Sequence, residues 1–173
     1  MIKTNSTNIL IFNKFYKIFF SRNYLSQEIY AYRNAKKNKM YSNFVHPIKS
    51  FVLGYYSEKG FKIDDKKFVS ITLNNLSLNE KNFISADQLI NSDLLKKKLD
   101  INIYEHLNLI SKLKVPLTGA HGDLHNDNII FNKKKELKFI DWRNYRDRNT
   151  FIYDLLHLKI RDFCLKLNRS WTE

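Results

Sequence analysis

The chain has one cysteine, Cys164, so it cannot form an internal disulfide, and a zinc site built on several thiolates is excluded. No apolar run reaches the roughly 18 residues that a membrane span needs. The most apolar segment, residues 5–20, is interrupted by Asn13, Lys14 and Lys17, and no small-residue cleavage site follows it, as a signal peptide would require. We therefore expect a cytoplasmic protein without a membrane span.

Acidic residues are also few, with 17 Asp and Glu against 30 Lys and Arg, which gives a formal net charge of +13. Such an excess usually suggests a nucleic acid or an anionic membrane as partner. Here the lysines are scattered along the chain, and there is no recognition helix, zinc pattern or RNA-binding aromatic motif. The sequence therefore argues against nucleic acid as a partner, while anionic small ligands remain compatible with the charge.

With only four glycines and two prolines to mark loops, the elements of the first half must be predicted from periodicity. Residues 8–20 have the β-branched and aromatic content of a strand pair with a turn at Asn13-Lys14, and residues 26–36 indicate a helix capped by Ser26. Residues 48–56 and 66–73 are then predicted to pair as a hairpin across a polar stretch.

The second half is richer in helical periodicity. Residues 99–114 carry an apolar stripe that ends at Lys114, and another helix is predicted from about Thr150. Between them a loop over 118–128 leads into a short hairpin formed by 129–131 and 137–140. The stripe expected to be buried in the last helix is Ile152, Leu155, Leu156, Ile160, Phe163 and Leu167.

Strands followed by helices, without regular alternation, predict an α+β fold. The length of 173 residues allows one well-buried core or a small lobe leaning on a larger one. A polar stretch around residues 74–82 is where we expect the connection. This divides the chain into a small β-rich lobe, 1–78, and a helical lobe, 79–173.

Three polar residues with a distinctive spacing stand in the segments HGDLHNDNIIF and FIDW: Asp123, Asn128 and Asp141. A loop presents the first carboxylate, the amide follows five residues later, and the predicted hairpin returns the second carboxylate to the same cleft. Mg²⁺ prefers oxygen ligands and keeps several waters, so Asn128 and Asp141, together with nucleotide phosphates, would suffice to hold it. Asp123 is then the candidate base for an acceptor hydroxyl in phosphoryl transfer.

These segments resemble the catalytic and metal-binding motifs of the aminoglycoside phosphotransferase and choline kinase group, which are relatives of protein kinases. The protein-kinase counterparts are H-R-D-L-x-x-x-N and D-F-G. The resemblance implies a protein-kinase-like fold, ATP and Mg²⁺ as cofactors, Asp123 as catalytic base, and Asn128 and Asp141 as metal-binding residues.

The resemblance extends more weakly to both sides of these motifs. It implies that Lys17, on a predicted strand, pairs with Glu28, early in the next helix, over the ATP phosphates, with Lys14 as the alternative lysine. The segment Tyr153-Asp154-Leu155 resembles the helix-start aspartate of the group. We expect His121, His125 and Asp154 to brace the catalytic loop by hydrogen bonding.

Two departures from the group's pattern leave alternatives open. Only sixteen residues precede Lys17 and none is glycine, so the hairpin that usually covers the phosphates is expected to be shortened or absent, and the chain ends at Glu173 where relatives continue. The expected function is therefore an ATP- and Mg-dependent phosphotransferase acting on a hydroxyl of a small molecule, with a catalytically impaired nucleotide-binding module as the alternative.

The acceptor and the metal chemistry also have competing interpretations. The positive charge favours an anionic or neutral acceptor, such as a sugar or a sugar derivative, and a partner chain is possible. A metallophosphoesterase would use four residues of metal-ligand type that lie in one short stretch: His121, Asp123, His125 and Asp127. Such a site needs further ligands, and His46, His106 and His157 have no recognisable ligand neighbours in the sequence.

Overall fold

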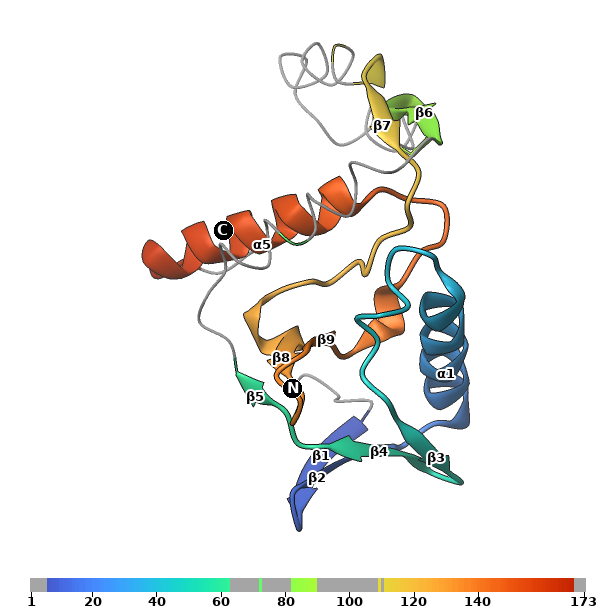
Figure 1. The fold of residues 1–173 in the computed structure, drawn as a ribbon, viewed down its shortest axis with the longest axis vertical. Helices are drawn as coiled ribbons and strands as arrows, with labels where there is room; N and C mark the ends of the chain where they lie inside the picture. Colours follow the sequence, from blue (N-terminus) through green and yellow to red (C-terminus); the bar gives the residue numbers. More distant parts are fainter. Residues whose placement is uncertain (1–5, 63–71, 73–81, 90–108, 110, 170–173) are drawn as a thin grey trace.

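The computed structural model describes residues 6–62, 72, 82–89, 109 and 111–169. This part of the chain is mixed α/β, with three small antiparallel sheets and two α-helices (Figure 1). In chain order the elements are β1 (Ser6–Ile11), β2 (Lys14–Phe19), α1 (Arg22–Lys37), β3 (Lys49–Phe51), β4 (Gly54–Glu58), β5 (Phe61–Lys62), β6 (Phe83–Ser85), η1 (Ala86–Gln88), β7 (Lys114–Pro116), η2 (Asn126–Asn128), β8 (Ile129–Phe131), β9 (Leu137–Phe139), η3 (Trp142–Asn144) and α5 (Phe151–Lys166).

The predicted strand pair near the start of the chain is confirmed as β1 and β2, which are part of a sheet with the order β1-β2-β4-β3. The turn consists of Phe12 and Asn13, one residue earlier than predicted, with φ angles of 44° and 60°. Positive φ at both central residues is the requirement of the tight hairpin turns whose twist matches the strands, and Asn tolerates it well. Lys14 is therefore the first residue of β2.

The hairpin predicted between residues 48–56 and 66–73 is wrong about its first strand. Residues 48–56 themselves turn back at Val52-Leu53, so β3 and β4 pair with each other. Gly54 permits this arrangement, because a Cβ on it would lie 2.0 Å from the backbone oxygen of Lys17 on β2. Residues 66–73 lie, apart from Thr72, outside the described part of the chain.

Helix α1 begins earlier than predicted, with Ser21 and not Ser26 as the residue before its first turn. Its buried face consists of Glu28, Ala31 and Ala35, which are spaced at helical period and face η3. The helix ends before Asn38, whose side-chain oxygen accepts hydrogen bonds from the backbone of Met40 and Tyr41. The small alanines allow the helix to lie close to the segment that carries the predicted metal site.

The predicted hairpin in the second half is confirmed as β8 and β9, which with β5 form a sheet of order β5-β8-β9. The prediction that Lys114 ends a helical stripe is wrong, because this residue begins β7 and pairs with Ser85 of β6. The next residues, Val115 and Pro116, complete β7, where proline is compatible with a short edge strand. The other stripe positions, 99, 103, 107 and 110, lie outside the described residues.

Helix α5 begins at Phe151, which confirms the predicted start near Thr150, and the Thr150 side chain caps the helix by accepting from the backbone of Ile152. The expected buried stripe is only partly correct: Leu156, Ile160, Phe163 and Leu167 are exposed. The buried face instead carries Phe151, Asp154, His157 and Leu158. Two polar residues occupy this face because it packs on the backbone of residues 121–124, whose N–H and C=O groups need partners.

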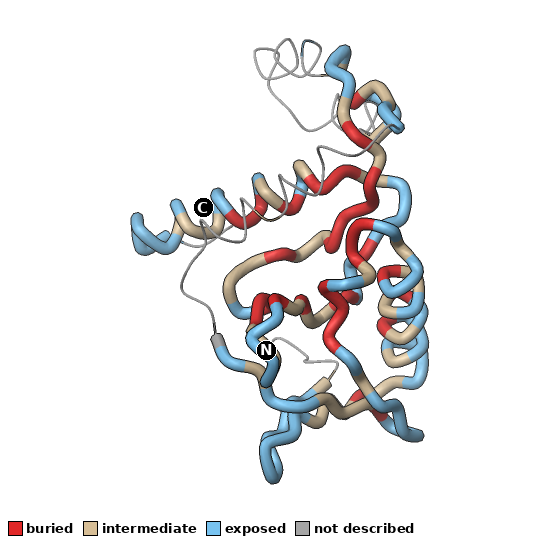
Figure 2. Tube along the Cα trace, viewed as in Figure 1, coloured by how far each residue is buried: buried red, intermediate tan, exposed pale blue. Residues whose placement is uncertain are grey.

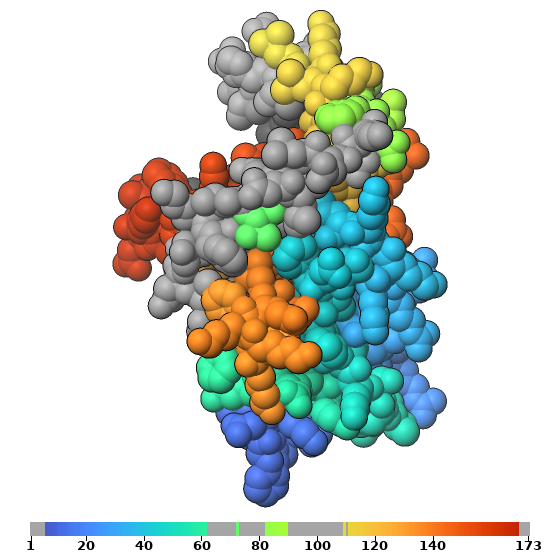
Figure 3. Space-filling model, in the orientation of Figure 1, coloured from blue at the N-terminus to red at the C-terminus, as the bar shows by residue number. Residues whose placement is uncertain are grey.

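One hydrophobic core joins the two halves of the described chain (Figure 2). It combines Ala31, Tyr41 and Phe44 from the first half with Phe139 and Trp142 from the second. In Figure 3 the orange β8–β9 region lies on the surface against the region containing β4 and β5, and an ion pair of 3.1 Å joins Lys133 to Glu58 there. The division into lobes at residue 78 stays a prediction, since most of 74–82 is not described.

Among the described helices, none is both long and apolar enough to cross a membrane.

Candidate active site

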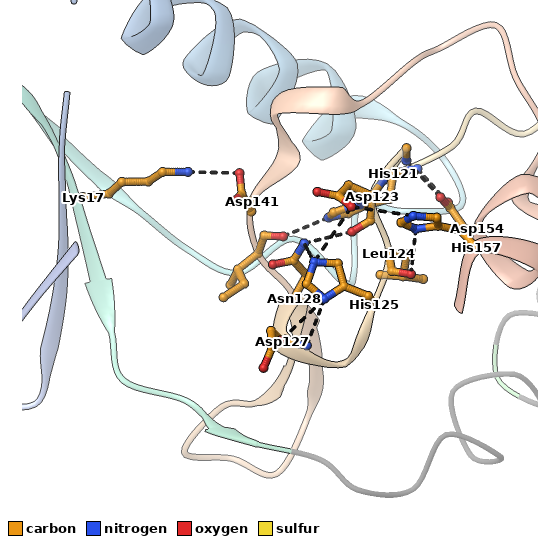
Figure 4. Close-up of polar contacts among 12 residues, drawn as sticks. Lys17, His121, Asp123, Leu124, His125, Asp127, Asn128, Asp141, Asp154 and His157 are labelled. Atoms are coloured by element: carbon orange, nitrogen blue, oxygen red, sulfur yellow. Dashed lines mark hydrogen bonds and ion pairs between the residues drawn. The ribbon is translucent and has the colours of Figure 1, made fainter. Parts of the chain in front are cut away.

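The first half of the site is a charge cluster around Lys17 of β2. Its Nζ lies 2.8 Å and 2.9 Å from the two carboxylate oxygens of Glu28 and 3.0 Å from Oδ1 of Asp141. Asp141 is 124 residues away in the chain, so only the tertiary fold brings it to this lysine (Figure 4). Lys14, the alternative lysine, instead extends over the ring of Tyr56. Of the two, Lys17 is the residue that the fold places between both carboxylates.

Glu28 is held in this cluster by a second donor. Its side chain is 2% exposed, and the hydroxyl of Tyr55 on β4 donates to Oε1. Burial raises the pKa of Glu28, although the charge of Lys17 acts in the opposite direction. The same burial and the neighbouring carboxylate raise the pKa of Tyr55. Helix α1, β2 and β4 are thereby joined at one point, which fixes the position of the Lys17 ammonium group.

Asp141 follows β9 in a left-handed backbone conformation, with φ and ψ both 61°. This conformation is uncommon for residues other than glycine and is tolerated best by Asn and Asp. Just before it, the N–H of Ile140 donates to the backbone oxygen of Asn128 at 3.0 Å. The side chain is 38% exposed and lines the cavity described below. The predicted metal-binding pair Asn128 and Asp141 therefore stands on two directly bonded segments.

The loop before β8 carries Asp123 and Asn128. The Asn128 side-chain nitrogen donates to the backbone oxygen of Asp123 at 2.8 Å and lies 3.1 Å from Nε2 of His125. These contacts bend the loop back on itself, as the five-residue spacing predicted. They do not engage the amide oxygen of Asn128, which is the atom that a magnesium ion would use. The Asp123 side chain is 34% exposed.

Hydrogen bonds made by His121 and Asp154 fix the start of this loop. Asp154 is fully buried and accepts from the N–H groups of His121 and Gly122, at 2.6 and 2.9 Å, and from the hydroxyl of Tyr41. Burial raises its pKa to about 6. The His121 ring, also fully buried, contacts the backbone oxygen of Ile140 at 2.9 Å, and burial lowers its pKa to about 4. This ring is therefore neutral at pH 7.

The backbone bends at Gly122, between His121 and Asp123, and only glycine fits there. Gly122 has a φ of +83°, and a Cβ on it would lie 2.2 Å from the backbone oxygen of Asn144. Any other residue would meet both an unfavourable backbone conformation and a collision with backbone.

Two imidazoles flank the Asp123 carboxylate. His125 Nε2 lies 3.8 Å and His157 Nε2 lies 3.9 Å from its Oδ1. The ring of His157 also contacts the backbone oxygen of Leu124 through Nδ1 at 3.2 Å (Figure 4). The backbone N–H of Asp127 also contacts Nδ1 of His125 at 3.4 Å, which orients this ring within the loop.

A cavity of about 680 Å³ lies beside these groups and is lined by residues from both halves of the chain. Lys17, Glu28 and Asp141 form part of its wall, and Asn128 and Asp127 form another. Tyr55, Ile48, Phe61, Ile130 and Phe139 give the remainder an apolar character. This volume lies within the range of pockets that bind cofactors and drug-sized ligands.

The described residues contain no group of three or more His, Cys, Asp or Glu side chains that could hold a metal ion. This does not support the metallophosphoesterase alternative, which requires such a group. The residues do fit a magnesium ion held in part by a nucleotide, because Asp141 and Asn128 both line the cavity and each has a side-chain oxygen of the kind that magnesium binds. His46, for which no ligand neighbours were expected, contacts the backbone oxygen of Glu58 through Nε2 at 2.9 Å.

Three contributing residues were missed by sequence reasoning: Tyr41, Tyr55 and His157. The hydroxyl of Tyr41 donates to Asp154 and that of Tyr55 donates to Glu28. In each pair the two residues are far apart in the sequence, so no local pattern indicates the contact. His157 could have been found, because it lies three residues after Asp154 on the same helix and so shares its face. His106 lies outside the described residues.

Comparisons of the chain with family models, with curated proteins and with solved structures found no match.

Proposed function

We propose that the protein is an ATP- and Mg-dependent phosphotransferase with a protein-kinase-like fold, acting on a hydroxyl of a small molecule. The observation that carries the proposal is the contact of Lys17 with both Glu28 and Asp141 at the wall of the cavity. A lysine held between a helix carboxylate and the carboxylate after a hairpin is the arrangement that the motif resemblance implies for binding nucleotide phosphates.

The roles of the residues follow from their positions. Lys17 would bind phosphate oxygens, and Glu28 would keep its ammonium group directed into the cavity. Magnesium, held by Asn128 and Asp141, would neutralise charge on the phosphates. Nucleotide binding would require the contact between Lys17 and Asp141 to rearrange, because both groups then bind the same charged ligand.

Asp123 would act on the acceptor. It accepts the proton of the acceptor hydroxyl while the bond between that oxygen and the γ-phosphorus forms. The bond from the γ-phosphorus to the bridging oxygen breaks at the same time, and ADP leaves with the electron pair. The Asp123 carboxylate is 34% exposed, and the imidazole nitrogens of His125 and His157 lie 3.8 and 3.9 Å from it. It can therefore receive a substrate hydroxyl, as this role requires.

The catalytically impaired nucleotide-binding module is the second candidate. The observation that favours it is the two-residue turn of the β1–β2 hairpin, Phe12 and Asn13, which has no glycine-rich segment to close over phosphates. Such a module would bind ATP but would not transfer phosphate.

The test is calorimetric titration with ATP, with and without Mg²⁺, followed by an assay for phosphotransfer. We expect binding that depends on Mg²⁺, and we expect Asp141→Ala to remove that dependence, since it deletes the anionic metal ligand. Asp87→Ala, an exposed carboxylate in η1, is the matched control and should behave as wild type. Equal ATP affinity with and without Mg²⁺ in the wild type would contradict the proposal.

A further inference from the structure

Three residues of α5 lie on one face of the helix beside the Asp123 loop. Tyr153, His157 and Arg161 are spaced by four residues, which places them one above another along the helix. The rings of Tyr153 and His157 are stacked, with centroids 6.1 Å apart and an interplanar angle of 12°. Tyr153 is 46% exposed, so its ring is accessible at the surface while the ring of His157 is buried beneath it.

This face meets the loop at Asp123. His157 Nε2 is 3.9 Å from Asp123 Oδ1, and its ring packs edge to face with that of His125, with centroids 6.4 Å apart. Arg161 lies one helical turn further along. It is close enough to act electrostatically on His125, whose pKa is lowered first by burial and also by the charge of Arg161.

The charges in this neighbourhood differ from those that a cationic acceptor requires. A cation beside the reacting hydroxyl would need carboxylates in addition to Asp123. The groups closest to the Asp123 carboxylate are instead the imidazoles of His125 and His157, and Arg161 adds a positive charge that acts on His125. Asp127 lines the cavity. Of the two acids on α5, Asp154 is buried and accepts from the backbone N–H groups of His121 and Gly122, and Asp162 is paired with Lys166 at 3.3 Å.

We propose that Tyr153, His157 and Arg161 form the acceptor side of the site, and that the acceptor carries an anionic group, a phosphate or a carboxylate, near the hydroxyl that Asp123 deprotonates. Arg161 binds the anionic group, since a guanidinium can donate two parallel hydrogen bonds to it. The exposed ring of Tyr153 offers a flat surface to the body of the acceptor. This inference rests on the proposed function and assigns the substrate class of the same site.

The experiment uses the full chain and one sugar ring with four different charges. Calorimetry first measures binding of a non-hydrolysable ATP analogue with Mg²⁺. With that analogue at saturation, glucose, glucose 6-phosphate, glucuronate and glucosamine are titrated, together with inorganic phosphate as the simplest anion. We expect inorganic phosphate and at least one anionic sugar to bind more tightly than glucose, and the comparison of phosphate with carboxylate identifies which anion is preferred.

Arg161→Gln is the decisive variant, and Lys159→Gln on the exposed side of the same helix is the matched control. We expect Arg161→Gln to weaken anion binding about tenfold or more, the scale of a lost charge-assisted hydrogen bond. Affinity for the ATP analogue should be unchanged, and the control should match wild type. The inference is overturned if anions do not bind, if Arg161→Gln leaves their binding unchanged, or if glucosamine binds most tightly.

The proposed function and the assignment of the acceptor are tested by different outcomes. Absence of Mg-dependent binding of the ATP analogue would contradict the proposed function itself and the inference with it. Normal binding of the analogue without any preference for anions would contradict only the assignment of the acceptor.

Discussion

Asp123 and Asp154 are carboxylates of the same small region with opposite surroundings. Asp154 is fully buried and accepts hydrogen bonds from three donors, whereas Asp123 is 34% exposed and has two imidazole nitrogens 3.8 and 3.9 Å from its Oδ1. A carboxylate fixed by backbone donors holds structure, and one that faces solvent can receive a proton from a substrate. The environment, more than the residue type, separates the two roles.

Replacing Asp123 by Asn should therefore impair transfer and little else. Asp123→Asn keeps the size of the side chain but removes the proton acceptor, so we expect the rate of phosphotransfer to fall by about 10²-fold or more. Nucleotide affinity, measured by calorimetry, should be almost unchanged because Asp123 does not line the cavity. Asp87→Asn serves as the control. A variant with full turnover would remove Asp123 from the mechanism.

His121 gives the site a dependence on pH through folding stability. Its pKa is lowered to about 4 in the folded protein by burial, from 6.5. The proton therefore prefers the unfolded chain, and the contribution of His121 to stability is lost as the pH falls from about 6.5 to 4. Asp154, with its pKa raised from 3.8 to about 6, acts in the opposite direction, because its protonation favours the folded state between pH 6 and 3.8.

These opposing effects can be separated with His121→Gln. We expect the stability difference between wild type and this variant to shrink by about 2 kcal/mol between pH 7 and pH 4.5, since only wild type loses the imidazole contribution. Urea denaturation at both pH values measures it. A folded-state titration of His121 by NMR near pH 6.5 would show that the ring is not held neutral.

At the level of elements, the sequence predicted what depends on local pattern. The strand pair at residues 8–20, the hairpin of β8 and β9, and the start of α5 were all predicted from residue content and periodicity. The start of α1 was missed because Ser21 and Ser26 are equally good caps by residue type. The buried face of α5 was missed because it includes the polar residues Asp154 and His157, which bond to backbone groups, and apolar periodicity does not indicate such residues.

The loop between β7 and η2 depends on one residue that no pattern of hydrophobicity reveals. Gly122→Ala should destabilise the protein by about 3 kcal/mol, because it combines an unfavourable positive φ with a contact to the backbone of Asn144. Urea denaturation at neutral pH is the measurement. Lys135→Gly, at the exposed turn of the β8–β9 hairpin where φ is 60°, is the matched control and should be neutral or slightly stabilising. Unchanged stability of Gly122→Ala would mean that the loop can adopt another path.

At the scale of the whole molecule, the site exists only because two distant segments meet. The motif residues Asp123, Asn128 and Asp141 could be singled out from spacing, since they lie within one stretch of the chain. Lys17 could be placed on a strand, but its choice over Lys14 required the tertiary structure, which brings Asp141 to within 3.0 Å of it. The hydrophobic core that α1 shares with Phe139 and Trp142 holds the segment of Lys17 and Glu28 against the segment of Asp141.

The same arrangement sets an expectation for ATP affinity. Phosphate recognition in a site of the proposed kind is shared between a metal, a strand lysine and a glycine-rich lid. Lys17, Asn128 and Asp141 can supply the first two, but the β1–β2 turn has only Phe12 and Asn13, with no glycine. Few backbone N–H groups can therefore approach the phosphates, and water remains free to screen the attraction from Lys17.

We expect an apparent dissociation constant for Mg-ATP of roughly 0.1–1 mM for the 173-residue chain, equivalent to about 4–5.5 kcal/mol of binding. Lys17→Met should weaken it further, whereas Lys14→Met should leave it unchanged, because Lys14 lies over the Tyr56 ring and does not line the cavity. Calorimetric titration of the purified monomer decides between the outcomes. Low-micromolar binding would show that the short hairpin, through Asn8 and Phe15 at the cavity wall, already covers the phosphates adequately.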